Sequence, residues 1–256
     1  MSRFRTATAV VLAGSLAAGS AACAPPGGGK GADRNLTVFA AASLQAPFTA
    51  LAGEFEASHP GTRVVLSFAG SADLAAQLGQ GAPADVFASA DHANMAKAAG
   101  AALLEGSPQD FASNVLAIAV PPANPANIGS FADLARPGVR VVVCAAQVPC
   151  GAAAKSAEGK AGVTLKPVSE ESAVTDVLGK VTSGEADAGL VYATDVRAAG
   201  GKVRGIPFPE AAVAVNHYPI AALRTSGNKE LAAAFVALVT GSEGQKILAD
   251  AGFGRP

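Results

Sequence analysis

Two serines in this chain stand where a strand-like run gives way to a helix-like run. Ser43 comes shortly after the apolar run at residues 36–39, and Ser71 comes shortly after a second run at residues 64–68. The first backbone N–H groups of a helix lack partners, and the helix dipole is positive at that end. Two such helix starts that met at one point would hold an anion without any lysine or arginine. These positions therefore indicate anion binding, although a helix N-cap is the commonest use of a serine there.

Two cysteines form a second candidate for chemistry. Cys144 and Cys150 lie six positions apart, and in an exported protein such a close pair is more often a disulfide than two free thiols. Two buried thiols that act as small hydrophobic groups are the alternative. Neither a further cysteine close by nor a nearby histidine completes a metal site, so no side chain is expected to bind a metal cation. The pair therefore predicts a disulfide that holds the shape of residues 145–149.

An enzyme is the main alternative from another class of protein. The three histidines, His59, His92 and His217, lie far apart, and no Gly-x-Ser-x-Gly, His-Glu-x-x-His or phosphate-loop motif is present. Cys150 as a nucleophile would need a base, and no motif supports a histidine in that role. The sequence therefore favours a binding protein with no catalytic residue and no cofactor.

The elements that would position these residues alternate between short β-rich runs and amphipathic helical runs. The strand-like runs are residues 36–39, 64–68, 85–88, 115–120, 139–143 and 188–192. Strand and helix at this cadence predict an α/β fold with mainly parallel sheets. Such sheets bind ligands outside the carboxyl ends of their strands, which is where both serines lie.

Composition limits the possible partners. The chain has 256 residues, of which 50% are hydrophobic and 15% charged, with a net charge of −1. This is enough apolar material for one large domain or two lobes of ordinary size. The basic residues are scattered singly rather than clustered, which argues against a nucleic-acid partner.

The N-terminus has the features of an export signal. Arg3 and Arg5 precede an uncharged apolar stretch, and small residues at 20–22 precede Cys23, so residues 1–22 are predicted to be a cleaved signal. As a membrane-spanning helix the stretch is short and weakly hydrophobic. Cys23 resembles the cysteine of the bacterial lipoprotein box, although Ser20 departs from the usual aliphatic residue, and ordinary cleavage is the alternative. Residues 23–33 are rich in proline and glycine and predict a tether, so the protein is expected to be exported and anchored by lipid to the outer face of the cell membrane.

Six short segments carry a resemblance to one family. They are residues 38–44 (VFAAASL), 67–71 (SFAGS), 81–91 (GAPADVFASAD), 148–151 (VPCG), 189–192 (GLVY) and 251–253 (AGF). Together, and in this order, they resemble the molybdate-binding proteins of bacterial ABC importers, within the periplasmic binding protein class. The resemblance implies a type II fold with two lobes, residues 34–116 plus 218–256 and residues 117–217, and an anion held between them.

The resemblance also implies which residues bind the anion. The ligating positions of the family fall on Ser43 and Ser71 in the first lobe and on Cys150, Val174 and Tyr192 in the second. The serines would donate from hydroxyl and backbone N–H, Cys150 and Val174 from backbone N–H only, and Tyr192 from its phenol. Cys150 departs from the alanine of other members, but a backbone donor does not depend on the side chain. Taken singly, Val174 is typical of a core residue and Tyr192 of an aromatic residue between lobes.

Molybdate fits a site made only of donors. It is a tetrahedral dianion with four acceptor oxygens and no proton, whereas hydrogen phosphate carries a proton that needs an acceptor. Tungstate is nearly the same size and is expected to bind too, and sulfate, separated only by its size, is the alternative ligand. A carboxylate in the cleft would favour a protonated anion, but Asp73, Glu170 and Glu171 are interpreted as solvated groups near helix starts. The partners that the resemblance implies for this monomer are an ABC permease and its ATPase.

Overall fold

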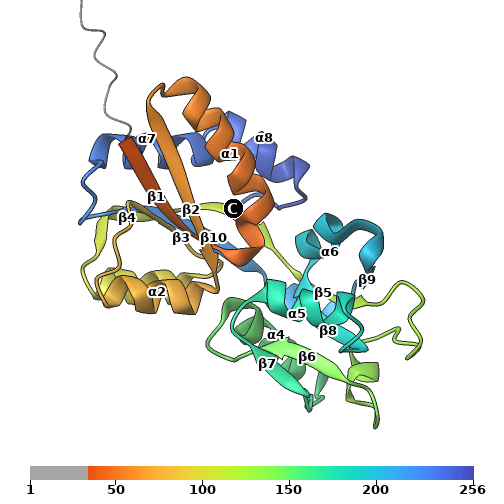
Figure 1. Ribbon diagram of the computed structural model, residues 1–256. Helices are drawn as coiled ribbons and strands as arrows, with labels where there is room; N and C mark the ends of the chain where they lie inside the picture. Colours follow the sequence, from red (N-terminus) through yellow and green to blue (C-terminus); the bar gives the residue numbers. More distant parts are fainter. Residues whose placement is uncertain (1–33) are drawn as a thin grey trace, which may run out of the picture. The chain divides into compact units, whose positions relative to one another are not determined.

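The computed structural model describes residues 34–256, which belong to one compact unit. The predicted signal at residues 1–22, the candidate lipidation residue Cys23 and the predicted tether at residues 23–33 lie outside the described residues. Within the described part, two five-stranded sheets flanked by helices make up the fold (Figure 1). No helix between residues 34 and 256 is long and apolar enough to cross a bilayer.

The first sheet contains strands from both ends of the described chain. Its order is β2 (Thr62–Ala69), β1 (Arg34–Ala41), β3 (Val86–Ala88), β10 (Asn216–Leu223) and β4 (Leu104–Asn114). Strand β1 is parallel to β2 and β3, while β10 is antiparallel to both β3 and β4. Only β10 therefore runs against the other strands of this sheet.

The second sheet repeats this arrangement with the middle of the chain. Its order is β7 (Ser169–Glu171), β6 (Val141–Cys144), β8 (Ala188–Tyr192), β5 (Leu116–Val120) and β9 (Arg204–Ile206). Strand β6 is parallel to β7 and β8, while β5 is antiparallel to β8 and β9. Here β5 is the reversed strand, in the same fourth place as β10 in the first sheet.

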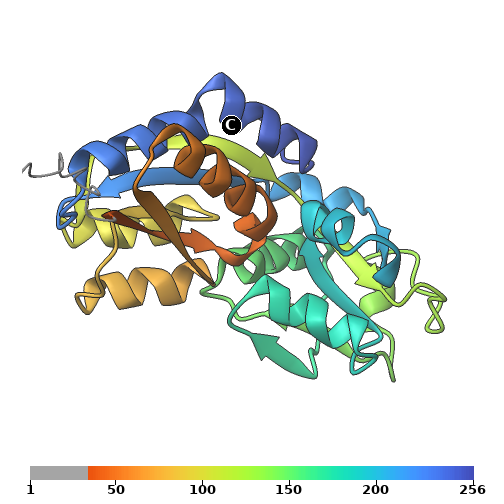
Figure 2. The same ribbon diagram turned by 45° about the horizontal axis from the view of Figure 1, so that its top comes forward.

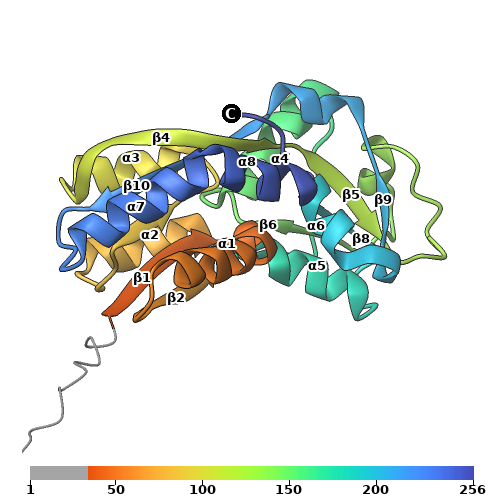
Figure 3. The ribbon, with the colours of Figure 1, turned by 90° about the horizontal axis from the view of Figure 1, so that it is seen from above.

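The chain passes between the sheets twice. Strand β4 continues across Val115 into β5 (Figure 3), and the chain returns from β9 into β10. The strand by which the chain enters a sheet from the other sheet is in both cases the reversed one. The predicted α/β fold is confirmed, and the sheets are mixed, with one reversed strand each.

Helices cover both faces of the first sheet. Helices α1 (Gln45–Ser58), α7 (Lys229–Thr240) and α8 (Ser242–Asp250) pack on one face and share a hydrophobic core with it. Helices α2 (Ser71–Gly79) and α3 (His92–Gly100) form a second core on the other face. Figures 1 and 2 show α1, α7 and α8 on the side of the sheet opposite α2. Leu44, Phe48, Leu51 and Phe55 follow one another at helical spacing and are completely buried in the first of these cores.

The second sheet has one continuous core. Helices α4 (Pro149–Ala161), α5 (Val174–Thr182) and α6 (Ala193–Ala199) pack against its strands, together with the apolar residues of the loop after β5. The shorter 3-10 helices are η1 (Ala42–Leu44), η2 (Ala132–Ala135), η3 (Gly200–Lys202) and η4 (Pro209–Val213). Helix α4 starts with Pro149, a residue suited to the first position of a helix, and ends at Gly162 in the left-handed conformation.

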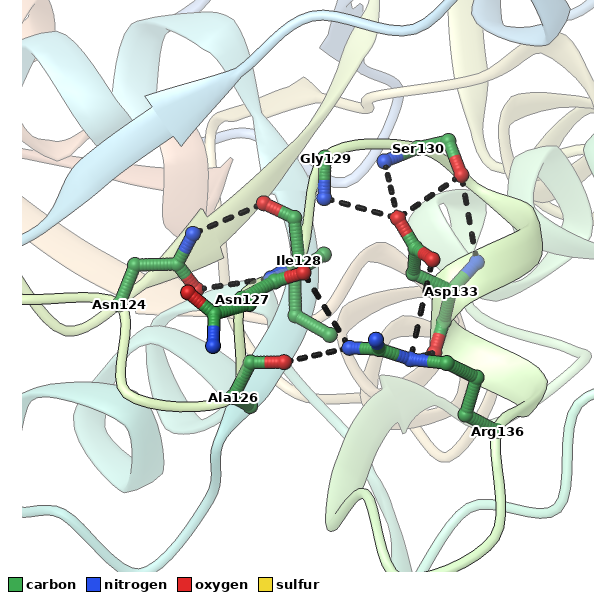
Figure 4. A network of polar contacts seen from close by, with 8 residues as sticks. All are labelled: Asn124, Ala126, Asn127, Ile128, Gly129, Ser130, Asp133 and Arg136. Carbon is green, nitrogen blue, oxygen red and sulfur yellow. Dashed lines mark hydrogen bonds and ion pairs between the residues drawn. The ribbon is translucent and has the colours of Figure 1, made fainter.

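A polar network orders the loop that leads from β5 towards β6 (Figure 4). The Asp133 carboxylate accepts hydrogen bonds from the backbone N–H of Gly129 (2.9 Å) and from the N–H and hydroxyl of Ser130 (2.8 and 2.9 Å). These bonds, that of Gly129 above all, lower the pKa of Asp133. Arg136 donates to the carbonyl oxygens of Ala126 and Asn127. The network fixes the route of the chain into β6, which ends at the first cysteine of the disulfide.

Candidate anion-binding site

Five helices of the described chain begin around one small cavity. Its lining residues belong to the starts of η1, α2, α4, α5 and α6 and to the loop after β3: Ala41, Ala42, Ser43, Gly70, Ser71, Ala90, Val148, Pro149, Cys150, Val174 and Tyr192. All five residues proposed as ligands from the sequence are among them. The first sheet contributes the serines and the second contributes the other three. The structure therefore brings together positions that are up to 149 residues apart in the chain, from Ser43 to Tyr192.

The cavity is the size of a very small ligand. The cavity volume is about 10 Å³, close to the minimum that holds a single water molecule. Pockets for drug-sized organic molecules measure about 300–1,000 Å³. A sugar, a peptide or a nucleotide does not fit this cavity as it stands, so the size argues against a large organic ligand.

The electrostatics of the cavity come from the backbone. None of these lining residues is charged, and no side chain caps the N-terminus of η1, α2, α4 or α5. By contrast, α3, which starts outside the cavity, is capped by Asp91, whose carboxylate accepts from the N–H of Asn94. Uncapped helix starts, with the positive ends of their dipoles, thus meet at one small cavity, an arrangement that attracts an anion.

The two serines do not act as helix caps. The hydroxyl oxygen of Ser71 accepts a hydrogen bond from the backbone N–H of Ala90 at 2.9 Å, and Gly70 is the N-cap of α2. The hydroxyl of Ser43 lies 3.0 Å from the hydroxyl of Tyr218. Because a hydroxyl has one hydrogen to donate, and the bond from Ala90 uses only a lone pair of Ser71, the hydrogen of Ser71 remains free for the cavity. The helix-cap interpretation therefore does not hold at either serine.

Tyr192 supplies an unpartnered hydroxyl at the cavity. Its side chain is 1% exposed, and its hydroxyl has no hydrogen-bond partner among the described residues. Burial raises the pKa of Tyr192 well above its ordinary value, so the phenol keeps its proton. Leaving such a group unpaired costs about 1–3 kcal/mol. The hydroxyl is placed to donate to a ligand, which would remove this penalty.

The start of α4 is held by the disulfide. Cys144, at the end of β6, is bonded to Cys150, with 5.7 Å between their Cα atoms. The intervening turn is closed by a hydrogen bond from the N–H of Val148 to the carbonyl of Ala145 at 2.9 Å. Gly151 is needed here, because a Cβ at this position would lie 2.0 Å from the Ala145 oxygen. The structure thus contains the predicted pairing, and the bond restrains the backbone N–H of Cys150 at the cavity.

Val174 has the double role expected for it. It is the first residue of α5, so its backbone N–H is not needed by the helix, while its side chain is buried in the second core. The carboxylates considered from the sequence stay away from the cavity. Asp73 and Glu170 are exposed, and Glu171 forms an ion pair with Lys180 at 2.9 Å. No group of three or more metal-binding side chains lies close together within residues 34–256.

Sequence reasoning missed three residues that shape this site. Ala90 and Tyr218 are the partners of the two serine hydroxyls, and Gly70 packs against the segment before α5, where a Cβ would lie 1.9 Å from the carbonyl oxygen of Ser172. Gly70 and Ala90 lie inside conspicuous motifs, so their position was a usable signal. Tyr218 is separated from Ser43 by 175 residues, and no local pattern links them.

Asp195 gives the site region a pH-dependent stability. Its carboxylate accepts the backbone N–H of Tyr192 at 2.9 Å, and burial raises its pKa to about 7 from 3.8. The folded state therefore binds this proton more tightly than the unfolded state does, so its contribution is complete below about pH 4 and is lost as the pH rises through 7. We expect the unfolding free energy to fall by up to roughly 4 kcal/mol over this range. Urea unfolding at a series of pH values measures it, and an Asp195→Asn variant with an unchanged pH slope would contradict the assignment.

Comparison with known proteins agrees with the class that this fold and cavity define. Residues 36–254 match the family described as bacterial extracellular solute-binding protein. The molybdate-binding protein ModA of Mycobacterium tuberculosis is 51% identical over 251 residues, which cover 97% of this chain and 96% of that protein. The chain therefore belongs to the ModA family of extracellular solute-binding proteins. Its relatives are solute-binding proteins of transporters and not enzymes.

Solved structures support the same fold. The periplasmic molybdate-binding protein of Azotobacter vinelandii superposes with a TM-score of 0.74 at 24% identity, covering 86% of this chain and 99% of that one. The sulfate-binding protein SubI of M. tuberculosis superposes with a TM-score of 0.72 at 22% identity, covering 86% of each chain. At these identities the likeness shows the fold alone. It confirms the prediction of a two-lobed periplasmic binding protein fold.

Proposed function

We propose that this protein captures molybdate between its two lobes and delivers it to an ABC permease that an ATPase powers. The observation that carries the proposal is the cavity itself, which is small, has no charged lining residue and lies at several uncapped helix starts. The identity of 51% to a protein named as molybdate-binding supports the choice of ion.

Five residues are proposed to hold the ion. Ser43 and Ser71 donate from their hydroxyl and backbone N–H groups, Cys150 and Val174 from backbone N–H, and Tyr192 from its phenol. Charge-assisted hydrogen bonds of this kind are about twice as strong as neutral ones. Every one of these groups offers a hydrogen, so the site satisfies an anion that has acceptors only.

The donor set limits which oxyanions are suitable. Hydrogen phosphate brings a proton for which such a cavity has no acceptor, and a buried unpaired group is penalised. Tungstate, which is nearly the size of molybdate, is expected to bind as well. Sulfate carries no proton either, so only cavity size discriminates against it, and it remains the alternative ligand.

The two lobes are proposed to comprise residues 34–116 plus 218–256 and residues 117–217. The chain changes sheet between Asn114 and Leu116 and returns at Asn216, within two residues of these bounds, which supports the division. Ligand binds donors from both lobes and so favours the closed state, which would then dock on the permease. The protein is further proposed to act as a monomer outside the cell membrane, with Cys23 as its lipid anchor after removal of residues 1–22.

Calorimetric titration of the purified protein with molybdate, tungstate, sulfate and phosphate in turn tests the proposal. We expect tight binding of molybdate and tungstate and much weaker binding of sulfate and phosphate. Equal or tighter binding of sulfate would replace the named ligand but keep the site. Absence of heat with all four anions would refute the function proposed here.

A further inference from the structure

We propose that Tyr218 is a positioning residue that aims the hydroxyl hydrogen of Ser43 into the cavity and thereby makes the site reject protonated oxyanions. The inference rests on the proposed function, because it concerns the same cavity. Tyr218 does not line the cavity itself, but its hydrogen bond to Ser43 keeps the Ser43 hydroxyl as a donor to the ligand.

Tyr218 connects Ser43 to a buried network of hydrogen bonds. It is on β10, it is completely buried, and its hydroxyl lies 3.0 Å from that of Ser43. On its other side, the amide nitrogen of Asn114 lies 3.5 Å from the Tyr218 hydroxyl and donates to the hydroxyl of Thr194 at 2.7 Å. The amide oxygen of Asn114 accepts the N–H of Val115 at 3.0 Å, which fixes the orientation of the amide. The group of Asn114 that faces Tyr218 is therefore a donor.

The direction of the hydrogen bond between Tyr218 and Ser43 follows from this arrangement. Among the described residues, the Ser43 oxygen is the acceptor at hydrogen-bond distance from the Tyr218 hydroxyl, since the Asn114 nitrogen cannot accept. The ring of Tyr192 lies 6.0 Å from that of Tyr218, but the Tyr192 hydroxyl forms no hydrogen bond within residues 34–256. If Ser43 donated to Tyr218, the phenolic hydrogen would be buried without an acceptor, which is unfavourable. Tyr218 therefore donates to Ser43. Burial raises the pKa of Tyr218, so this hydrogen is retained.

The hydroxyl oxygen of Ser71 also accepts a hydrogen bond from the protein, and a side chain of β10 again takes part. The N–H of Ala90 donates to the Ser71 oxygen at 2.9 Å, and the carbonyl of Ala90 accepts from the side chain of Asn216 at 2.8 Å. Asn216 and Tyr218 are two positions apart on the strand, so their side chains lie on the same face. Side chains of β10 therefore contribute to the hydrogen bonding of both serines. At each serine, a protein donor uses one lone pair of the hydroxyl oxygen, and the hydroxyl hydrogen is left for the cavity.

The consequence is selectivity by protonation state. Sulfate and hydrogen phosphate are tetrahedral dianions of similar size that differ by one proton, so the ratio of their affinities isolates this effect from cavity size. With Tyr218 donating to one of the two lone pairs of the Ser43 oxygen, the Ser43 hydrogen is directed to the anion, and a proton on the facing oxygen of hydrogen phosphate meets this hydrogen and not an acceptor. Without the Tyr218 hydroxyl, Ser43 can turn its hydrogen away and accept the proton, and hydrogen phosphate is no longer penalised there.

The test compares the two anions in Tyr218→Phe at mildly alkaline pH, where phosphate carries one proton. Competition against molybdate should show that the ratio of sulfate to phosphate affinity falls by about fivefold or more, the range expected when one buried unpaired group is relieved. In a Ser43→Ala background the same substitution should leave the ratio unchanged, because no hydroxyl remains to be aimed. Tyr192→Phe is the matched control, and it should weaken both anions with little change in their ratio.

A second variant keeps the test informative if Tyr218→Phe does not fold. Asn114→Asp places an acceptor beside Tyr218, which then donates away from Ser43, so the ratio should fall as well. The added negative charge weakens both dianions alike and cancels in the ratio. An unchanged ratio in the folded variants, or an equal change without Ser43, would overturn the role of Tyr218. Failure of the unaltered protein to bind any of the three anions would instead overturn the proposed function.

Discussion

Replacing Gly70 with alanine is expected to leave the protein folded and to weaken molybdate binding by about a hundredfold or more. A Cβ at Gly70 would lie 1.9 Å from the carbonyl oxygen of Ser172 and 3.1 Å from its carbon. Gly70 precedes α2 of the first lobe and Ser172 precedes α5 of the second, so the clash arises only where the lobes meet. The backbone angles of Gly70, φ −60° and ψ 140°, are ordinary for alanine, and the separate lobes are not strained.

The size of this effect follows from the proposed donors that would be pulled away. The proposed ligands Cys150, Val174 and Tyr192 all follow strands of the second sheet or end one, and a hydrogen bond to a charged group contributes about 1.5–3 kcal/mol. Loss of two such bonds already amounts to a factor of about a hundred or more, since each tenfold change in affinity corresponds to about 1.4 kcal/mol.

Two measurements on matched variants check the Gly70 prediction. Calorimetry gives the affinity, and X-ray scattering should show that molybdate compacts the unaltered protein but not Gly70→Ala. Gly53→Ala is the control, because a Cβ at Gly53, inside α1, meets no atom within 4 Å. If Gly70→Ala bound molybdate as tightly as Gly53→Ala does, the cavity would not depend on this contact between the lobes.

The first-sheet motifs and the helical stripes were predictable because each is a local pattern. The runs at residues 36–39 and 64–68 correspond to β1 and β2, and the run at residues 188–192 coincides with β8. Strands β1 and β8 are largely buried, which selects continuous apolar residues that are easily recognised, whereas β2 lies at the edge of its sheet and exposes Arg63 and Val65. The two serines were found for the same reason, since the end of a buried strand followed by a helix start is visible in the sequence.

The strands that link the two lobes were not predictable in this way. Strand β4 lies at the edge of its sheet and is exposed from Glu105 to Asp110, so it lacks an apolar alternation. Strand β10 contains Pro219, and its register with β4 is irregular on either side of that residue. Both depend on long-range pairing between segments about a hundred residues apart. The hydrogen bond between Tyr218 and Ser43 depends on that strand pairing, so no local sequence pattern could predict it.

Substituting proline for Val174 is expected to delete one backbone donor from the cavity and to lower molybdate affinity by roughly 10- to 150-fold. Proline is suited to the first position of a helix, whose N–H has no partner in the helix, and α4 beside the same cavity already begins with Pro149. The preceding residue, Ala173, has φ −140° and ψ 149°, which is the extended conformation that a following proline requires.

The matched variant for this test is Val174→Ala, which removes the buried side chain but keeps the N–H. Both variants should lose some stability, because the Val174 side chain packs in the second core. Only Val174→Pro should lose the larger share of its affinity in calorimetry, with thermal melting of each variant confirming that it is folded. Equal affinities in the two variants would mean that the start of α5 contributes its dipole but no direct hydrogen bond. A clear difference would identify the backbone N–H of Val174 as a ligand of the ion, which no side-chain substitution at this position can do.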